Sequence, residues 1–518
     1  MGRHEVFEIA VTSSTVYGNP FTETRLEAEF TGPEGQRVKL SGFYDGEGSW
    51  KARFVPDREG IWRYRAVLAG KGNAAKKSGQ FRCVPSARRG FIRISKRNPY
   101  RFESPDGKLF HPLGMQFGWG IPSRPGFDGP DNKEWHAADR EEVVRAFRGS
   151  VNIIRSQMGT GTSAGVAMDL FRDSPDLFSY NIGRCREVDD SCRIIRREGW
   201  AQIMTPFQDM SEWFEDTTVF GKTRDTKTYK TLKGPNLPAI EAYLRYVVAR
   251  WAAYTDIWEI YNEDSYCPTE YLAHLAGIIR GADPYGHPIT TNYDRPREEW
   301  CEILTPHFYF GSGMPHEAPA ELVRQSAVWK SYAKPVLCTE FGNGGQPGFS
   351  NYDPVRWRVS AWTLFMQEIG VIFWNMSGRK IPPRGENEKG GNLNAYLDRE
   401  TRRAFRVLLD FADGLPSTLK PTLSGWCGQG LVESFILTDG ERAAVYLHNH
   451  LRPGEKVDPQ GLYFAGLGQG KYRVTWIDPA TDRRLAELAF NSPGTFATIP
   501  TVPFTIDAAA RIERTGRE

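Results

Sequence analysis

The chain has 518 residues, which is too long for a single hydrophobic core and suggests about three domains. Its 66 Lys and Arg residues nearly balance its 63 Asp and Glu residues, and the two signs are interspersed, so the charge points neither to nucleic acid nor to an anionic membrane. The longest apolar runs fall far short of the roughly 20 residues that a membrane-spanning helix needs.

Residues 1–88 have the pattern of short strands separated by turns. Apolar and polar residues alternate with a period of two in EVFEIAVTS, TRLEAEFTG and GIWRYRAVLAG. Gly, Pro and Asn-Pro separate these runs. The pattern predicts a small N-terminal β-sandwich, and the segment from Val84 to Tyr100, rich in Pro, Ser, Arg and Lys, marks its boundary.

Residues 89–415 alternate short apolar strands with amphipathic helices, which is typical of a parallel α/β fold. Eight strands are predicted: FHPLGMQF, NIIRSQM, AQIMTPF, DIWEIYNE, PITTNYD, EILTPHFYF, PVLCTEF and VIFWNMS. The helices predicted between and after them include EEVVRAFRG, LPAIEAYLRYVVARWAAY, TEYLAHLAGIIRGA, ELVRQSAVWKSYA, PVRWRVSAWTLFMQEI and DRETRRAFRVLLDFADGL. Eight such units favour a (β/α)8 TIM barrel. A doubly wound sheet is the alternative, but no Gly-rich phosphate fingerprint follows any strand.

Residues 416–518 return to a strand pattern. The segments GLVESFILTDGERAAVYLHNH and KYRVTWIDPATDRRLAELAF each contain a hairpin-type turn, so a C-terminal β-sandwich is predicted.

The seven cysteines are scattered, odd in number and without Cys-x-x-Cys spacing. This distribution argues against a disulfide framework and against a zinc cluster. Cys185 and Cys192 could pair across a loop in an exported protein, but reduced thiols are expected. We expect no metal site and no cofactor.

Two glutamates end strands that are predicted three positions apart in the barrel. The fourth strand ends in Asn262-Glu263 and the seventh in Glu340. Catalytic groups of TIM barrels sit at the carboxyl ends of the strands. Two carboxyl groups there can bracket a glycosidic bond, one protonating the leaving oxygen and the other attacking the anomeric carbon.

This pattern resembles that of the clan A glycoside hydrolases, over the roughly 300 residues of the barrel. Asn262-Glu263 on the fourth strand and Glu340 on the seventh carry the resemblance. It implies that Glu263 is the general acid/base and Glu340 the nucleophile.

Further positions agree with the same resemblance. It implies that Arg155 keeps the nucleophile ionised and that Asn262 binds the sugar 2-hydroxyl. His307 and Tyr309 look like the clan's His-x-Tyr pair, with Tyr309 near the nucleophile, and Trp374 looks like the platform beneath the sugar. Purely structural interpretations stay open: Arg155 as a barrel-core ion pair, His307 as a structural histidine and Trp374 as a packing residue.

Glu259 shares a strand face with Glu263 but lies about 13 Å lower at 3.3 Å per residue, so we interpret it as a structural carboxylate. Asp264 is expected in a loop. To act as an acid, Glu263 needs a raised pKa, for which Tyr261 and Tyr266 could supply apolar neighbours.

The flanking domains extend the resemblance to a group of uncharacterised or apiosidase-like barrel hydrolases. The N-terminal strands and PLGMQFGWG at the first barrel strand are similar to that group, whose chains run sandwich, barrel and small β-domain. Gln116 and Trp119 in this segment are further candidates for substrate binding. Apiosidases use an Asp at one catalytic position, so two glutamates put an apiose substrate in doubt.

Three long segments, 117–135, 158–197 and 375–395, are predicted loops after barrel strands. Long loops favour a closed pocket and exo cleavage of short glycans. Contacts within a homo-oligomer are the alternative role. The acidic residues of the second loop fit no EF-hand spacing. The N-terminal residues lack an apolar signal-peptide region, which leads us to expect a cytoplasmic protein unless a signal has been removed.

The sequence therefore predicts a retaining glycoside hydrolase that acts on short oligosaccharides or glycosides. A transglycosidase with the same glutamates and a non-catalytic carbohydrate-binding barrel are the alternatives. A metal-dependent barrel hydrolase would need several His residues at strand ends, and among nine His only His307 is so placed.

Overall fold

The computed structural model describes most of the chain, and every structural statement below concerns these residues: 1–71, 74–116, 140–158, 170, 174–208, 227–264, 267–293, 295–310, 318–343, 353–374, 397, 399–426 and 432–516. The chain divides into two compact units, which we describe one at a time. Their bounds are Met1–Arg93, Phe117–Ile121 and Ile154–Thr305 for the first, and Ile94–Gln116, Pro122–Ile153 and Pro306–Glu518 for the second.

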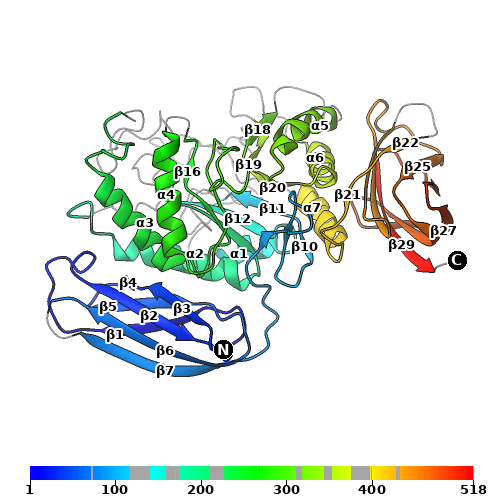
Figure 1. The fold of residues 1–518 in the computed structure, drawn as a ribbon. Coiled ribbons are helices and arrows are strands. Elements are labelled where there is room, and N and C mark those ends of the chain that lie inside the picture. The colour runs from blue at the N-terminus through cyan, green and yellow to red at the C-terminus, as the bar shows by residue number, and fades with distance from the viewer. Residues whose placement is uncertain are drawn as a thin grey trace. The chain divides into compact units, whose positions relative to one another are not determined.

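The first unit begins with the predicted β-sandwich. A four-stranded sheet has the order β3-β2-β6-β7 and a three-stranded sheet the order β1-β5-β4, with antiparallel pairing throughout (Figure 1). In β2, Leu26, Ala28 and Phe30 alternate with more exposed residues and pack into one core with the buried Trp62. The sandwich is thus present, and its boundary at residue 88 stays a prediction. Its strands are β1 (Phe7–Thr12), β2 (Arg25–Thr31), β3 (Arg37–Ser41), β4 (Phe43–Tyr44), β5 (Ser49–Phe54), β6 (Gly60–Ala69) and β7 (Ala75–Cys83).

The first unit also holds four of the predicted barrel strands and the helices between them. Each strand is buried along its whole length, as expected for strands covered on both faces. The strands are β12 (Ile153–Gln157), β13 (Ala201–Thr205), β15 (Ile257–Glu259) and β17 (Ile289–Thr290), and two short ones, β14 (Phe207–Gln208) and β16 (Tyr261–Asn262), continue β13 and β15. The helices are α2 (Ile182–Arg197), α3 (Leu237–Trp251) and α4 (Thr269–Ala282).

The helix α2 corrects the sequence analysis, which treated 158–197 as one loop. Asn181 caps this helix by accepting a hydrogen bond from the backbone N–H of Arg184. Cys185, Val188 and Cys192 form its buried apolar stripe, which a charged residue, Asp189, interrupts. Because a charged residue lies within the buried stripe, the sequence lacks the regular apolar period that predicts a helix.

The second unit holds the other four barrel strands. They are β11 (Leu113–Gln116), β18 (His307–Phe310), β19 (Val336–Asn343) and β20 (Ile369–Phe373). The helices are α1 (Arg140–Phe147), α5 (Ala318–Trp329), the short 3-10 helix η3 (Lys330–Tyr332), α6 (Pro354–Met366) and α7 (Arg399–Ala412). A small antiparallel sheet of β8 (Arg93–Ile94), β9 (Phe102–Glu103) and β10 (Leu109–Phe110) was not predicted. No helix of the described residues is long and apolar enough to cross a membrane.

The eight predicted strands all exist and belong to one sheet. Its hydrogen-bonded order is β17-β15-β13-β12-β11-β20-β19-β18. Barrel strands that are consecutive in the chain are neighbours in this order, apart from β17 and β18 at its two ends, and the eighth barrel strand, β20, pairs in parallel with the first, β11. This is the strand order of a TIM barrel. Because the strands run in parallel, their carboxyl ends lie at one edge of the sheet, where α/β proteins place their functional residues.

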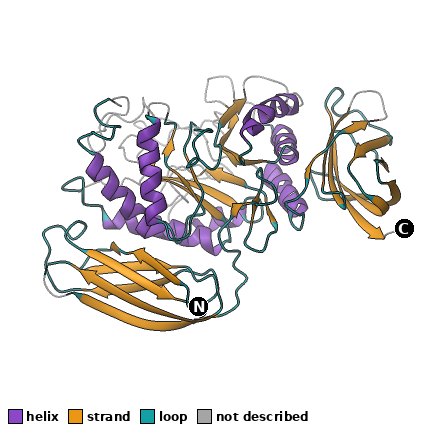
Figure 2. Cartoon of the chain, in the orientation of Figure 1, coloured by secondary structure: helices purple, strands orange, loops and turns teal. Residues whose placement is uncertain are grey.

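The C-terminal part of the second unit is the predicted second β-sandwich, whose described residues form strands and loops and no helix (Figure 2). Its sheets have the orders β21-β23-β24-β29-β26-β27 and β22-β25-β28, and both contribute to one core. Arg358 of α6 binds Asp507 of this domain through two hydrogen bonds of 2.9 and 3.1 Å. The strands are β21 (Lys420–Pro421), β22 (Ser424–Trp426), β23 (Val432–Thr438), β24 (Arg442–Asn449), β25 (Gly461–Ala465), β26 (Gln469–Ile477), β27 (Arg484–Pro493), β28 (Phe496–Pro500) and β29 (Asp507–Gly516).

Candidate active site

Glu263 directly follows β16 and has an unusual backbone conformation. Its φ of 53° lies in the left-handed region, which non-glycine residues rarely adopt and which is often found at functional sites. The side-chain oxygen of Asn292 accepts a hydrogen bond of 3.1 Å from the Glu263 backbone N–H. The Asn292 amide also donates to the backbone oxygen of Thr305. Asn292 therefore holds the backbone of Glu263 in place.

Sequence analysis missed Asn292, although it lies at the end of the predicted fifth strand, where a polar side chain is informative. Asp264 lies in a loop, as expected, and is fully buried. It accepts from the Thr291 hydroxyl and pairs with Arg295 at 3.2 Å. The turn after β16 is thus fixed by the polar contacts of the buried Asp264 side chain.

A second buried network lies below this turn. Arg155 of β12 donates to Glu259 at 2.6 Å and to the side-chain oxygen of Asn262 at 2.7 Å. The Thr205 hydroxyl donates to the same Glu259 oxygen at 2.7 Å. The interpretation of Glu259 as a structural carboxylate agrees with these contacts. The role expected for Arg155 beside the nucleophile stays a prediction.

The contact with Arg155 fixes the orientation of the Asn262 side chain. Because guanidinium groups only donate, the atom of Asn262 that faces Arg155 must be its oxygen. The Asn262 NH2 group consequently points away from the guanidinium. It is left as a donor at the carboxyl end of β16.

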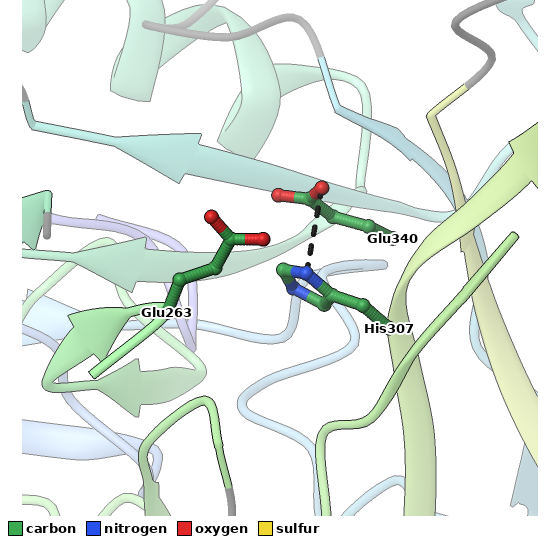
Figure 3. Close-up of side chains that lie close together, drawn as sticks. All are labelled: Glu263, His307 and Glu340. Atoms are coloured by element: carbon green, nitrogen blue, oxygen red, sulfur yellow. Dashed lines mark ion pairs between the residues drawn. The ribbon is translucent and has the colours of Figure 1, made fainter. Parts of the chain in front are cut away.

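Glu340 lies in β19 of the second unit and is 5% exposed. The Tyr309 hydroxyl donates a hydrogen bond to the carboxylate oxygen Oε2. The His307 Nδ1 lies 3.5 Å from the same oxygen (Figure 3). The cause is strand register, since His307 of β18 lies opposite Glu340 and Tyr309 follows two residues later on the same face. The His-x-Tyr spacing thus gathers both polar side chains at one carboxylate.

Of the remaining predicted site residues, Gln116 and Trp374 are described by the structure. Gln116 ends β11 and is 1% exposed. Trp374 directly follows β20, is half-buried, and donates from its backbone to the Phe341 oxygen. Trp119 and Tyr266 lie outside the described residues, as do the predicted loop 375–395 and all of 117–135.

Comparisons with known proteins agree with the fold. The model of DUF5060, a domain of unknown function, matches residues 1–69. No curated protein sequence matches the chain. A crystal structure from Bacteroides vulgatus ATCC 8482, provisionally described as a glycoside hydrolase, matches 99% of this chain and 99% of its own at 16% identity and a TM-score of 0.67.

Two further structures match 83% of this chain. One is a family 5 glycoside hydrolase from Bacteroides vulgatus ATCC 8482, covered over 94% at 15% identity and a TM-score of 0.57. The other, described as a glycoside hydrolase, is covered over 98% at 14% identity and a TM-score of 0.56. The chain therefore has the fold seen in these glycoside hydrolase structures.

Proposed function

We propose that the protein is a retaining glycoside hydrolase with Glu263 as general acid/base and Glu340 as nucleophile. In the first step Glu263 protonates the leaving oxygen while a Glu340 oxygen attacks the anomeric carbon, and the glycosidic C–O bond breaks. In the second step Glu263 removes a proton from water, which releases the sugar from Glu340. The anomeric configuration is inverted twice and thereby retained.

The observation that carries this proposal is the environment of Glu340. A nucleophilic carboxylate must be held in one orientation and must be protected from bulk water. The Tyr309 hydroxyl and the His307 ring both contact Oε2, and the carboxylate is buried in the carboxyl-terminal half of the barrel strand β19.

The position of Glu263 supports the same chemistry. It follows the fourth strand of the parallel sheet and Glu340 lies in the seventh, so both belong to the edge at which functional residues of such sheets gather. The oriented NH2 group of Asn262 is suited to donate to the sugar 2-hydroxyl. A retaining mechanism requires carboxyl groups about 5–5.5 Å apart. We expect a crystal structure to show this separation between Glu263 and Glu340.

The substrate is proposed to be a glycoside or short oligosaccharide, cleaved from its end. Exo action rests on the segments 117–135 and 375–395, which the sequence predicts to be long loops after barrel strands. Transglycosylation uses the same covalent intermediate, with a sugar hydroxyl in place of water. Product analysis with and without a sugar acceptor separates these two outcomes.

The proposal is tested by following hydrolysis of a panel of chromogenic glycosides, furanosides included, by proton NMR. We expect the first product formed to have the anomeric configuration of the substrate, before mutarotation mixes the anomers. An inverted first product would contradict the covalent mechanism. Absence of hydrolysis across pyranosides, furanosides and both anomers would contradict the proposal as a whole.

Replacing Asn292 by Ala is expected to lower kcat by about 10- to 100-fold, because Glu263 loses the acceptor that holds its backbone in a left-handed conformation. KM should change by less than about threefold, since Asn292 is a positioning residue that does not touch the substrate. Steady-state kinetics on the best substrate of the panel measures both parameters. Loss of kcat should be smallest on substrates with good leaving groups, which need little help from the acid.

Asn152 offers a matched control at the amino end of β12. Its side chain likewise bridges backbone groups of a neighbouring segment, accepting from Leu113 N–H at 3.0 Å and donating to the His111 oxygen at 2.8 Å. Asn152→Ala should lower the Tm and leave kcat near the wild-type value. If both variants reduce kcat equally and independently of the leaving group, Asn292 has only a structural role.

A further inference from the structure

Gln157, the last residue of β12, has a buried side chain that neither the proposed mechanism nor the structural networks use. Side chains alternate along a strand, so Gln157 lies on the same face as Arg155 and one pleat nearer the carboxyl end. The Arg155 contacts with Glu259 and Asn262 identify this face as the one that carries the candidate site. Ser156 lies on the opposite face, where its hydroxyl accepts from Gln202.

The amide nitrogen of Gln157 has no hydrogen-bond partner among the described residues, although Gln157 is only 3% exposed. The amide nitrogen of Gln202, in the neighbouring strand β13, shows the ordinary arrangement of a buried donor. It is 3.1 Å from the Ser156 hydroxyl and 3.5 Å from the Cys192 sulfur. Buried amide donors are nearly always paired in folded proteins, so an unpaired one near the mouth of a site implies an occupant that supplies an acceptor.

We infer that Gln157 is a specificity-determining residue that donates from Nε2 to a hydroxyl group of the bound sugar. This inference rests on the proposed function. The side chain lies at the carboxyl end of its strand, where barrel proteins bind their substrates. The Gln157 amide ends β12 and the Asn262 NH2 group ends β16. Together these two donors select a sugar that has two acceptor hydroxyls.

A bound water is the competing occupant. Glu259 Oε1 also lacks a partner among the described residues, and a water could bridge such an acceptor to the Gln157 donor. The two occupants differ in one measurable respect. A sugar hydroxyl makes the contribution of Gln157 depend on which hydroxyl the substrate carries, whereas a structural water contributes equally to all substrates.

The experiment measures kcat/KM of the wild type and of Gln157→Leu on the best substrate and on its monodeoxy analogues. Leu has nearly the size of Gln but no donor. We expect Gln157→Leu to lose about 10- to 100-fold in kcat/KM on the parent substrate, as for other lost contacts to a substrate hydroxyl. On one monodeoxy analogue the variant and the wild type should become equal within about twofold, since the contact is then absent in both.

Gln202→Leu is the control variant, because the amide nitrogen of Gln202 is paired with Ser156 and Cys192 on the other face of the sheet. It should lower the Tm and leave kcat/KM unchanged on every analogue. If Gln157→Leu lowers the Tm by more than that control does, Gln157→Met replaces it as the less branched variant.

Two results overturn the inference while leaving the proposed function intact. One is a Gln157 variant whose kcat/KM stays within about twofold of wild type, and the other is an equal loss on the parent substrate and on every analogue. Absence of glycoside hydrolysis by the wild type would instead overturn both proposals.

Discussion

Glu340→Gln is expected to lower kcat by about 10⁴-fold while the protein keeps its fold. The amide cannot attack the anomeric carbon, so the covalent step is lost, and removal of a nucleophile typically costs several orders of magnitude. The amide oxygen can still accept from the Tyr309 hydroxyl, which keeps the local structure intact. Turnover of an activated aryl glycoside, with the Tm measured in parallel, tests this prediction.

A matched comparison with Glu263 distinguishes the two roles. Glu263→Ala should retain most activity towards substrates whose leaving group needs no proton, and it should lose activity towards poor leaving groups. With azide added, Glu263→Ala should yield a glycosyl azide of retained configuration, whereas Glu340→Ala should yield the inverted azide. Full turnover by either Glu340 variant, or the same azide product from both, would remove Glu340 from the mechanism.

The barrel strands could be predicted because burial on both faces leaves a strong local signal. The predicted strand segments NIIRSQM and AQIMTPF contain β12 and β13, in the order expected, and both strands are buried throughout. The His307-x-Tyr309 spacing was equally informative. Its two side chains share a strand face, and register brings that face against Glu340.

The contacts that orient the site could not be predicted, because they depend on how distant segments meet. The hydrogen bonds of Arg155 to Glu259 and Asn262, for example, join residues more than 100 positions apart in the chain. The position of a residue along its strand does not determine which carboxylate its long side chain reaches. The hydrogen bond from Glu263 to Asn292 depends likewise on a left-handed turn that no residue preference signals.

Asp189 illustrates the same limit in the scaffold. The sequence placed it in a pocket loop, but it lies in α2 and is 1% exposed. It accepts hydrogen bonds from Arg53 of the β-sandwich, at 2.6 and 2.8 Å, and from Arg250 of α3, at 2.8 and 3.2 Å. The Trp251 indole donates to it at 2.9 Å. This one carboxylate joins the N-terminal domain to two barrel helices.

Asp189→Asn is expected to destabilise the protein by about 3–5 kcal/mol, because it leaves two buried guanidinium groups with too little negative charge. The shift of the unfolding transition in denaturant or heat measures the loss. Asp190→Asn is the matched control, since Asp190 is exposed and its one ion pair among the described residues is with Arg193, across one helical turn. Its effect should lie within about 0.5 kcal/mol. Equal effects of the two substitutions would contradict a structural role for the buried cluster.

The same cluster predicts how stability depends on pH. Burial alone would raise the pKa of Asp189, but the hydrogen bonds and charges of Arg53 and Arg250 outweigh it and hold this pKa at about 2. In the unfolded chain the pKa of an Asp is about 3.9. A carboxyl with a depressed pKa stabilises the fold fully above the unfolded value and loses that contribution as pH falls towards the folded value. The stability difference between wild type and Asp189→Asn should therefore be constant from pH 7 to about 5 and shrink between about pH 4 and pH 2. A difference that stays constant down to pH 2 would show that the charge of Asp189 is not what holds the sandwich to the helices.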